Sequence, residues 1–325
     1  MEIIMKAAVI SSFGTAPSYE EFPAPIPAGD DEMVIDVIAA GLHPRVRSQA
    51  DGSHYTSTGD LPLVPGIDGV GRGADGLLRY FVLPDTRVGA MAEQTVIDTR
   101  RSIVLPGDAD PIAVAAAMNP AMSSWVALRQ RVPFRAGQNV LVLGATGNAG
   151  QLAVQIAKRL GASQVIAAGR HAGRLAGLPA LGATGTVLLD GNADGVARRL
   201  GQAAAEVDVV IDYLWGEPTT ATMVAVVAGR ADRGQPLTWI EIGSVAGPAA
   251  AIPSAALRAA RLQIVGSGQG SVSTREILAE LPALAEEITG GSFEIDARPT
   301  SLTDVEQAWS DAAGPAQRIV ITPQS

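Results

Sequence analysis

The strongest constraint on the fold is a glycine-spaced turn that joins an apolar strand to an amphipathic helix. Residues 139–143 read NVLVL, which is typical of a strand buried on both faces of a parallel sheet. The turn GATGNAG overlaps the start of residues 148–162, where apolar side chains recur at steps of three and four and predict a helix. A second apolar strand is expected at 164–169. The segment therefore has the order strand, helix, strand.

Strands and helices go on alternating after this segment. VDVVIDYL, LTWIEIGS and LQIVGSG read as strands, whereas GVARRLGQAAAE and TATMVAVVAGRA read as helices. This pattern predicts the α/β class, with a doubly wound parallel sheet of the Rossmann type. Right-handed crossovers would bring the carboxyl ends of all strands to one edge, where ligands bind. The residues expected at that edge are Gly144, Gly169, Asp212, Gly243 and Gly266.

The glycine-spaced turn is a candidate site for a dinucleotide. The expected pattern G-x-G-x-x-G falls on Ala145-Thr146-Gly147-Asn148-Ala149-Gly150, with alanine in the first place. Gly147 would let the backbone approach a pyrophosphate, and Gly150 would allow close packing of helix and strand. Free N–H groups at the start of the helix would bind the anion. A plain turn between a strand and a helix is the alternative.

The end of the next strand distinguishes two cofactors. An acidic residue there would bind a ribose 2′-hydroxyl and indicate NAD, but this sequence has AAGRHAGRL. Arg170 and Arg174 stand where a 2′-phosphate would lie, and a guanidinium suits a phosphate. We therefore predict NADP(H). The alternative is that both arginines are solvated side chains at the start of a helix. His171 is interpreted as a bystander, and the adenine is its one candidate contact.

Composition excludes several other classes. The chain has no cysteine, which removes disulfides, thiolate nucleophiles and cysteine-ligated metals. The net charge is −9 and basic residues never exceed two in a row, so we expect no nucleic-acid partner. No apolar run reaches the roughly 18 residues of a membrane helix, and the first residues do not resemble a signal peptide. We expect a cytoplasmic protein with no membrane partner.

Several further segments occur in an order that resembles a known family. They are VIAAGLHPRVRSQADGSHY, LPLVPGIDGVG, FRAGQNVLVLGATGNAGQLAVQIAKRLGA, LGATGTVLLD, DVVIDYLWG, WIEIGSVAG and VEQAWSDAAGPAQRIVIT. Over nearly its full length the chain resembles the medium-chain dehydrogenase/reductase superfamily, and more closely its zinc-free quinone oxidoreductase branch. The resemblance implies a GroES-like catalytic domain from residues 1–118 and 272–325, wrapped around a Rossmann domain from 119–271. It also implies a nicotinamide in the cleft between them, and a homodimer joined through edge strands such as LQIVGSG.

The chain departs from the zinc enzymes of this superfamily. They carry a cysteine where this chain has His43, and Gly-His-Glu where it has Gly66-Ile67-Asp68. The cysteine loop of the structural zinc is also missing. One histidine cannot supply the three protein ligands of a catalytic zinc, so we expect no metal. Quinone reductases of the family usually have asparagine near His43, lysine at Arg174 and often tyrosine at Asp190.

Without a metal, the protein mainly positions the nicotinamide and the acceptor and supplies hydrogen bonds. Two residues are candidate catalytic groups. Tyr55 follows DGSH in a loop that, by resemblance, faces the cleft, and it would hydrogen-bond the acceptor oxygen or deliver a proton. His43 would donate to a carbonyl or hold the nicotinamide ribose. A rim aromatic and a structural histidine are the alternatives. Asp68 is expected to brace a loop.

The resemblance also places serines near the cofactor. Ser123 and Ser124 fall where the family helix touches the nicotinamide, and Asn119 would support that turn. At late strand ends, Gly243, Ser244, Ser267 and Gly268 offer backbone groups for the carboxamide.

Three functional hypotheses remain open from the sequence. The leading one is an NADPH-dependent reductase of quinones or α,β-unsaturated carbonyls, which accept hydride readily. The second is a 2-enoyl-thioester reductase acting on a CoA or carrier-protein substrate. The third is an NADPH-binding sensor or structural protein without turnover.

Overall fold

The chain folds into two compact units. The computed structural model describes residues 3–53, 57, 59–84, 86–311 and 317–323. One unit consists of Met1–Asn119 and Leu278–Ser325, and the other of Pro120–Ile277. Helices α2 (Pro111–Val126) and α8 (Thr274–Thr289) pass from one unit to the other. The boundaries expected from the sequence, 118/119 and 271/272, fall within α2 and shortly before α8.

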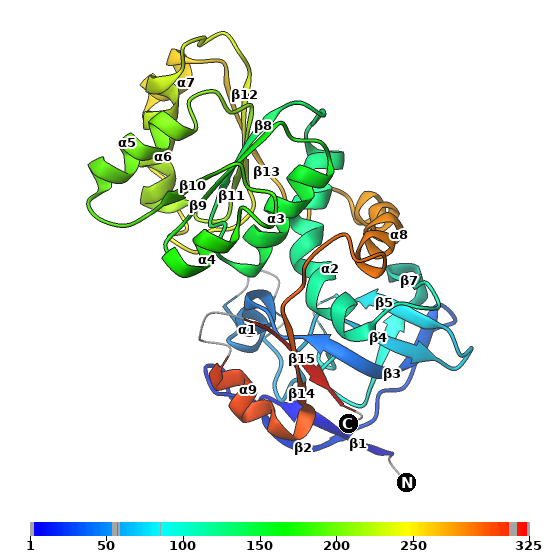
Figure 1. Ribbon diagram of the computed structural model, residues 1–325. Coiled ribbons are helices and arrows are strands. Elements are labelled where there is room, and N and C mark those ends of the chain that lie inside the picture. The colour runs from blue at the N-terminus through cyan, green and yellow to red at the C-terminus, as the bar shows by residue number, and fades with distance from the viewer. Residues whose placement is uncertain (1–2, 54–56, 58, 85, 312–316, 324–325) are drawn as a thin grey trace. The chain divides into compact units, whose positions relative to one another are not determined.

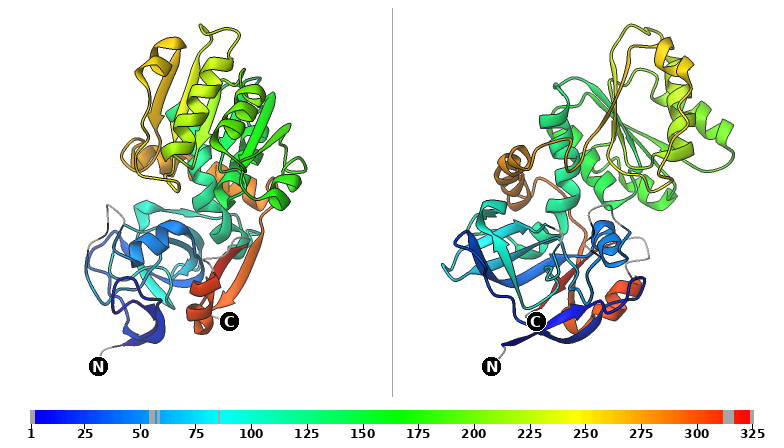
Figure 2. Two further views of the ribbon diagram at one scale, coloured as in Figure 1. Left: turned by 90° about the vertical axis from the view of Figure 1, so that its left-hand side faces the viewer. Right: turned by 180° about the vertical axis from the view of Figure 1, so that it is seen from behind.

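A six-stranded parallel sheet forms the centre of the second unit, in the order β10-β9-β8-β11-β12-β13. In Figure 1, α5, α6 and α7 lie on one side of this sheet and α3 on the other, and Figure 2 shows its strands from two further directions. The predicted doubly wound sheet is therefore confirmed. The elements are β8 (Asn139–Leu143), α3 (Asn148–Arg159), β9 (Gln164–Gly169), α4 (Ala172–Gly177), β10 (Gly185–Leu188), α5 (Ala193–Ala203), β11 (Val209–Asp212), α6 (Gly216–Gly229), β12 (Leu237–Glu241), α7 (Ser254–Ala259) and β13 (Leu262–Gly266).

The strands of this sheet end in line. Asp212 at the end of β11 pairs with Leu143 of β8 on one side and with Glu241 of β12 on the other. The loops that follow these strands therefore start at the same edge, where the sequence placed its ligand site. The core behind the edge consists of apolar side chains from strands and helices, among them Leu141, Leu143, Ile166, Val210, Met223, Val226 and Trp239.

The first unit is built around a seven-stranded, mainly antiparallel sheet. Its strand order is β14-β15-β3-β4-β5-β7, with β6 paired to β3. A separate antiparallel pair consists of β1 and β2. The strands are β1 (Ile4–Val9), β2 (Ser18–Pro23), β3 (Glu32–Gly41), β4 (Asp68–Gly73), β5 (Leu78–Val82), β6 (Gln94–Asp98), β7 (Ser102–Val104), β14 (Ala297–Ser301) and β15 (Arg318–Thr322).

Both ends of the chain contribute to the core of this unit. Strand β15, near the C-terminus, pairs with β3, which explains why residues far apart in sequence share one core. Short helices complete the unit: α1 (Pro44–Ala50), the 3₁₀ turns η1 (Thr99–Arg101) and η3 (Leu302–Asp304), and α9 (Val305–Asp311). The buried side chains include Ile10, Ile35, Val37, Phe81, Met91, Ile97, Trp309, Ile319 and Ile321.

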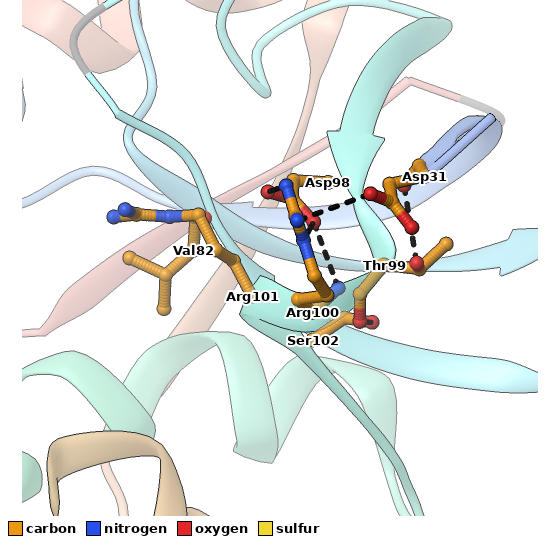
Figure 3. A network of polar contacts seen from close by, with 7 residues as sticks. All are labelled: Asp31, Val82, Asp98, Thr99, Arg100, Arg101 and Ser102. Atoms are coloured by element: carbon orange, nitrogen blue, oxygen red, sulfur yellow. Dashed lines mark hydrogen bonds and ion pairs between the residues drawn. The ribbon is translucent and has the colours of Figure 1, made fainter. Parts of the chain in front are cut away.

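An exposed charge network fixes the turn after β6 (Figure 3). Arg100 donates to both carboxylate oxygens of Asp98, at 2.9 Å each, and its Nη1 lies 3.0 Å from Oδ2 of Asp31. The hydrogen bonds from Arg100 lower the pKa of the Asp98 carboxyl. Because the guanidinium is largely exposed, the network contributes little to stability. We interpret it as a local clamp on the η1 turn.

One helical segment corrects an expectation from the sequence. Pro111–Arg131, which is α2 extended by the π-helical segment η2 (Ala127–Arg131), is long and apolar enough to cross a membrane by length and composition. The sequence pattern suggested that no run reached that length. However, 67% of the most apolar window is buried inside the protein, as in the core helix of a globular fold.

Candidate functional site

The turn between β8 and α3 presents an uncapped helix end. Gly147 is the N-cap residue of α3 and, having no side chain, makes no side-chain cap. The first turn of α3 carries no acidic residue, so the positive end of the helix dipole is not neutralised locally. The turn itself is closed by a hydrogen bond of 3.0 Å from Gly147 N to Gly144 O. Such a helix end is suited to an anion.

The two later glycines of the turn have different surroundings. A Cβ at Gly150 would lie 2.2 Å from Gly144 O and 2.6 Å from the Cα of Ala145. A Cβ at Gly147 would meet only Gly144 O, at 3.5 Å, among the atoms of the described residues. Gly150 therefore permits close packing of α3 against the turn, whereas Gly147 leaves open space in front of the backbone. Asn148 and Ala149 form the start of α3 between them.

Arg174 is held against this turn. Its Nη1 donates to the carbonyl of Thr146 at 3.0 Å. Its Nη2 is buried and has no hydrogen-bond partner among the described residues. A Cβ at Gly169, the last residue of β9, would lie 2.5 Å from Cγ2 of Thr146, so a side chain there would displace that of Thr146. The structure thus brings Thr146, Gly169 and Arg174 together and leaves one buried guanidinium nitrogen without an acceptor among the described residues.

Arg170 and His171 differ from Arg174 in their surroundings. Arg170 is exposed, at the end of β9. His171 is the N-cap of α4, and its Nδ1 accepts a hydrogen bond from Arg174 N at 3.3 Å. The sequence interpreted His171 as a bystander; the structure shows that it caps the helix that carries Arg174.

Gly243 and Ser244 follow β12 after one intervening residue, Ile242. The N–H of Gly243 donates to the carbonyl of Asp212 at 3.2 Å, so this donor is already used. Ser244 is exposed. Of these two residues, only Ser244 has a side chain with which to contact a ligand.

Ser267 and Gly268 follow β13. Ser267 N donates to Glu241 O at 2.8 Å, and Gly268 N donates to the hydroxyl of Ser271 at 2.8 Å. The backbone donors expected for a carboxamide at this position are therefore occupied in the structure. Their carbonyls, or the half-buried Ser267 side chain, would have to provide any contact.

The two serines of α2 differ in burial and in their closest hydrogen-bond partners. Ser124 is fully buried, and its hydroxyl is 3.4 Å from the carbonyl of Ala121 in its own helix. The Ser123 hydroxyl lies 2.8 Å from the hydroxyl of Tyr213, in the loop after β11, and Ser124 also hydrogen-bonds that phenol. Sequence reasoning missed Tyr213, because no local pattern links it to a serine in another helix.

In the first unit, His43 belongs to a buried polar cluster. Its Nε2 lies 2.9 Å from Oδ1 of Asp68, and the hydroxyl of Tyr80 donates to Oδ2 at 2.8 Å. All three side chains are at least 96% buried. Burial lowers the pKa of His43 in spite of the opposing charge of Asp68, and it raises that of Tyr80 well above its usual value. Asp68 therefore accepts from two neutral donors and, as expected, braces this region.

Arg318 brings a positive charge to the same cluster. Its Nη1 donates to Leu42 O at 2.9 Å, beside His43 in sequence. Burial lowers the pKa of Arg318 to about 10, so the guanidinium stays charged at neutral pH, and the charge of Asp68 acts in its favour. Neither Arg318 nor Tyr80 was proposed from the sequence, because they come from strands β15 and β5, far from His43 along the chain.

Two further expectations concern Tyr55 and metals. Tyr55, and His54 beside it, lie outside the described residues. Among the residues that the structure does describe, no group of three or more His, Cys, Asp or Glu side chains could hold a metal ion. In particular, the Nε2 atom of His43 already contacts Asp68.

The chain was compared with protein-family models, with the sequences of known proteins and with solved structures. No protein-family model matches the chain. A probable NADPH-dependent quinone reductase, tdiC, of Emericella nidulans is 30% identical across 98% of this chain and 100% of that protein. The chloroplastic NADPH-dependent alkenal/one oxidoreductase of Arabidopsis thaliana is 30% identical over 42% of this chain and 40% of its own length. Among solved structures, a mycobacterial quinone oxidoreductase shares the fold with a TM-score of 0.82 at 21% identity, over 98% of this chain and all of the other.

Proposed function

The chain belongs to the medium-chain dehydrogenase/reductase superfamily, in its quinone oxidoreductase-like branch, and we propose that it transfers hydride from NADPH to a quinone or an α,β-unsaturated carbonyl. The family predicted from the sequence is thereby confirmed. The observation that carries the proposed activity is the β8–α3 turn, where an uncapped helix end, an open glycine and a partly unpaired arginine meet.

The residues of the turn fit a pyrophosphate. The N–H groups of Asn148, Ala149 and Gly150 begin α3, and no side chain caps them within the described part of the chain. Gly147 leaves room for phosphate oxygens to reach these donors. We assign cofactor binding to the unit Pro120–Ile277, which contains the whole turn.

Arg174 supports NADPH rather than NADH. Its Nη1 is anchored on Thr146 O, and the buried Nη2 lacks a partner among the described residues, which is unfavourable until an acceptor arrives. A 2′-phosphate at the end of β9 would supply that acceptor. Arg170, exposed beside it, adds a second positive charge.

The reaction requires two electrons and two protons. Bound NADPH supplies a hydride, and the second proton reaches the acceptor from the protein or from water. Because Asp68 takes the proton-bearing Nε2 of neutral His43, the Nδ1 atom can only accept a hydrogen bond. Of the two roles predicted for His43, donation to a carbonyl does not fit this geometry, and holding a ribose hydroxyl stays a prediction. Tyr55 stays the proposed group for the acceptor oxygen.

A homodimer and independence from zinc are further parts of the proposal. Strand β13 pairs only with β12 in the described sheet, so its outer edge is open to a second copy. The chemistry around His43 supports a reaction without zinc, because the described residues offer no three-ligand cluster there.

A titration followed by an acceptor panel tests the proposed function. We expect NADPH fluorescence to change on binding, and NADPH to be oxidised by 1,4-quinones and short enones. Oxidation by enoyl-CoA alone would instead indicate the 2-enoyl-thioester reductase. Binding without oxidation by any acceptor would refute the catalytic proposal and favour a sensor, and absence of binding would refute the cofactor assignment as well.

A further inference from the structure

A buried carboxylate organises the loop after β11. Asp212 is fully buried, and its Oδ1 accepts from the N–H groups of Leu214 and Trp215, at 2.8 and 3.1 Å. Its Oδ2 accepts from the hydroxyl of Thr219 at 2.6 Å and from the indole N–H of Trp239 at 2.9 Å. Four donors from β12, α6 and the loop therefore converge on one side chain. Such complete pairing is what makes a buried carboxylate tolerable.

The loop held by Asp212 has an unusual backbone. Trp215 has φ 54°, and among the described residues it is the only non-glycine with a positive φ. Gly216 follows with φ 68°. A bulky residue in this region is strained, so surrounding interactions must hold it in place. The hydrogen bond from Trp215 N to Asp212 is one of them, and it fixes the path of the chain just after Tyr213.

Tyr213 lies between the loops of the two neighbouring strands. A Cβ at Gly144, at the start of the β8–α3 turn, would be 3.2 Å from the Cβ of Tyr213. On the other side, a Cβ at Gly243 would be 3.4 Å from Tyr213 O. Because β11 stands between β8 and β12 in the sheet, the loop is enclosed at the ligand-binding edge. The backbone at Tyr213 therefore lies close to the loops that follow both neighbouring strands.

The hydrogen bonds of Tyr213 have a defined direction. The hydroxyl of Ser123 donates its single proton to Pro120 O at 2.7 Å. We therefore assign the proton of the 2.8 Å contact between the two hydroxyls to Tyr213, with Ser123 as acceptor. Burial raises the pKa of Tyr213 to about 12, so it keeps this proton at neutral pH. What the half-buried phenol offers to a ligand is the lone pairs of its oxygen.

We propose that the phenol oxygen of Tyr213 accepts a hydrogen bond from the nicotinamide half of the bound dinucleotide, and that Asp212 is the positioning residue for Tyr213. This inference rests on the proposed NADPH site. The arginines for the 2′-phosphate follow β9, on one side of β8, whereas Tyr213 follows β11, on the other side. With the pyrophosphate at the β8–α3 turn, the half of the dinucleotide that extends over β11 is the half that carries the nicotinamide. Its carboxamide N–H and its ribose hydroxyls are hydrogen-bond donors.

Comparison of two ligands tests the role of Tyr213. Tyr213→Phe should raise the dissociation constant for NADPH about three- to tenfold, as expected for the loss of one hydrogen bond. The constant for adenosine 2′,5′-bisphosphate, which lacks the nicotinamide half, should change less than twofold. Tyr19→Phe, on the exposed strand β2, is the matched control and should change neither constant.

The outcomes separate this inference from the proposed function. Equal weakening of both ligands by Tyr213→Phe would show a general disturbance of the site and would overturn the inference, as would an unchanged NADPH affinity. If the unaltered protein binds neither ligand, the proposed function itself fails.

A double-mutant cycle tests Asp212. Asp212→Asn should weaken NADPH selectively in the same way, because the new amide faces the donors of Thr219 and Trp239 and the loop shifts. Combined with Tyr213→Phe, it should add less than its separate effect, since both changes remove the same contact. If Asp212→Asn does not fold, Thr219→Val removes one hydrogen bond to Oδ2 and serves for the same cycle. Fully additive effects, or equal loss of both ligands, would refute the positioning role.

Discussion

The two glycines of the β8–α3 turn provide a test in which binding and folding respond separately. Alanine at Gly147 would introduce a methyl group with one neighbour, Gly144 O at 3.5 Å, among the described residues. The backbone there has φ −82° and ψ 163°, which alanine adopts without strain. Alanine is a poorer N-cap than glycine, which lowers the free energy of unfolding. It also reduces the conformational entropy of the unfolded chain, which raises the free energy of unfolding by about 0.4–1 kcal/mol. These effects oppose each other, so the free energy of unfolding should change by less than about 0.5 kcal/mol.

Alanine at Gly150 should have the opposite profile. Its methyl group would lie 2.2 Å from Gly144 O and 2.6 Å from the Cα of Ala145, and both neighbours are backbone atoms. A gain of about 1 kcal/mol in helix propensity is offset by overpacking of about 1–3 kcal/mol. Since backbone cannot rotate away, we expect the upper end of that range and a net loss of about 1–2 kcal/mol.

Loss of NADPH affinity should rank the two variants in the opposite order from loss of stability, with Gly147→Ala affected more than Gly150→Ala. At Gly147 the methyl group would occupy the space proposed for phosphate oxygens, and a clash of about 1–3 kcal/mol corresponds to roughly five- to 150-fold weaker binding. Urea unfolding gives the stability of each variant, and nucleotide fluorescence gives the dissociation constant. Wild-type affinity in a stable Gly147→Ala protein would refute the placement of the pyrophosphate.

Three further predictions concern charge and metal. Replacing Arg170 and Arg174 by alanine should weaken NADPH about tenfold or more and NADH less than twofold, as measured by fluorescence titration; equal losses would remove the 2′-phosphate assignment. Because the folded-state pKa of His43 lies below 6.5, the unfolded chain binds this proton more tightly. The stability that neutral His43 contributes should be fully present above about pH 6.5. As the pH decreases below 6.5, this contribution should decrease by up to about 1.4 kcal/mol per pH unit. Urea unfolding of His43→Gln should lack this component, and an identical pH dependence in both proteins would contradict it. Metal analysis should find no stoichiometric zinc, and quinone reduction should persist in the presence of a chelator; loss of activity that zinc restores would refute this.

The local part of the fold was predictable because it depends on short-range patterns. The strand expected at 164–169 has those bounds in the structure. The helix expected at 148–162 begins at Asn148 and ends at Arg159, since Gly161, with φ 91°, cannot continue it. In both cases, apolar periodicity and a glycine signal lie within a few residues of each other.

The polar clusters were not predictable, because their members come from distant segments. Tyr213 and Ser123 are 90 positions apart, and Asp212 and Trp239 are 27 apart. Composition offers no signal for such pairs when neither residue belongs to a motif. Asp212 was expected only at the edge of the sheet, as the last residue of an apolar strand, and its partners required the structure.

The charge of the chain shows why binding must be determined locally. The protein carries a net charge of −9, whereas NADPH is a polyanion, so the field of the whole molecule opposes their association. At physiological salt this repulsion is screened over about 8 Å, but a contact inside the site is not. The start of α3 and the guanidinium of Arg174 lie at one turn, and the helix end is neither capped nor neutralised by an acidic side chain in its first turn. Because the long-range electrostatic field is unfavourable, these local hydrogen-bond donors must supply the attraction for NADPH. Small changes at Gly147 and Arg174 should therefore decide the affinity for NADPH.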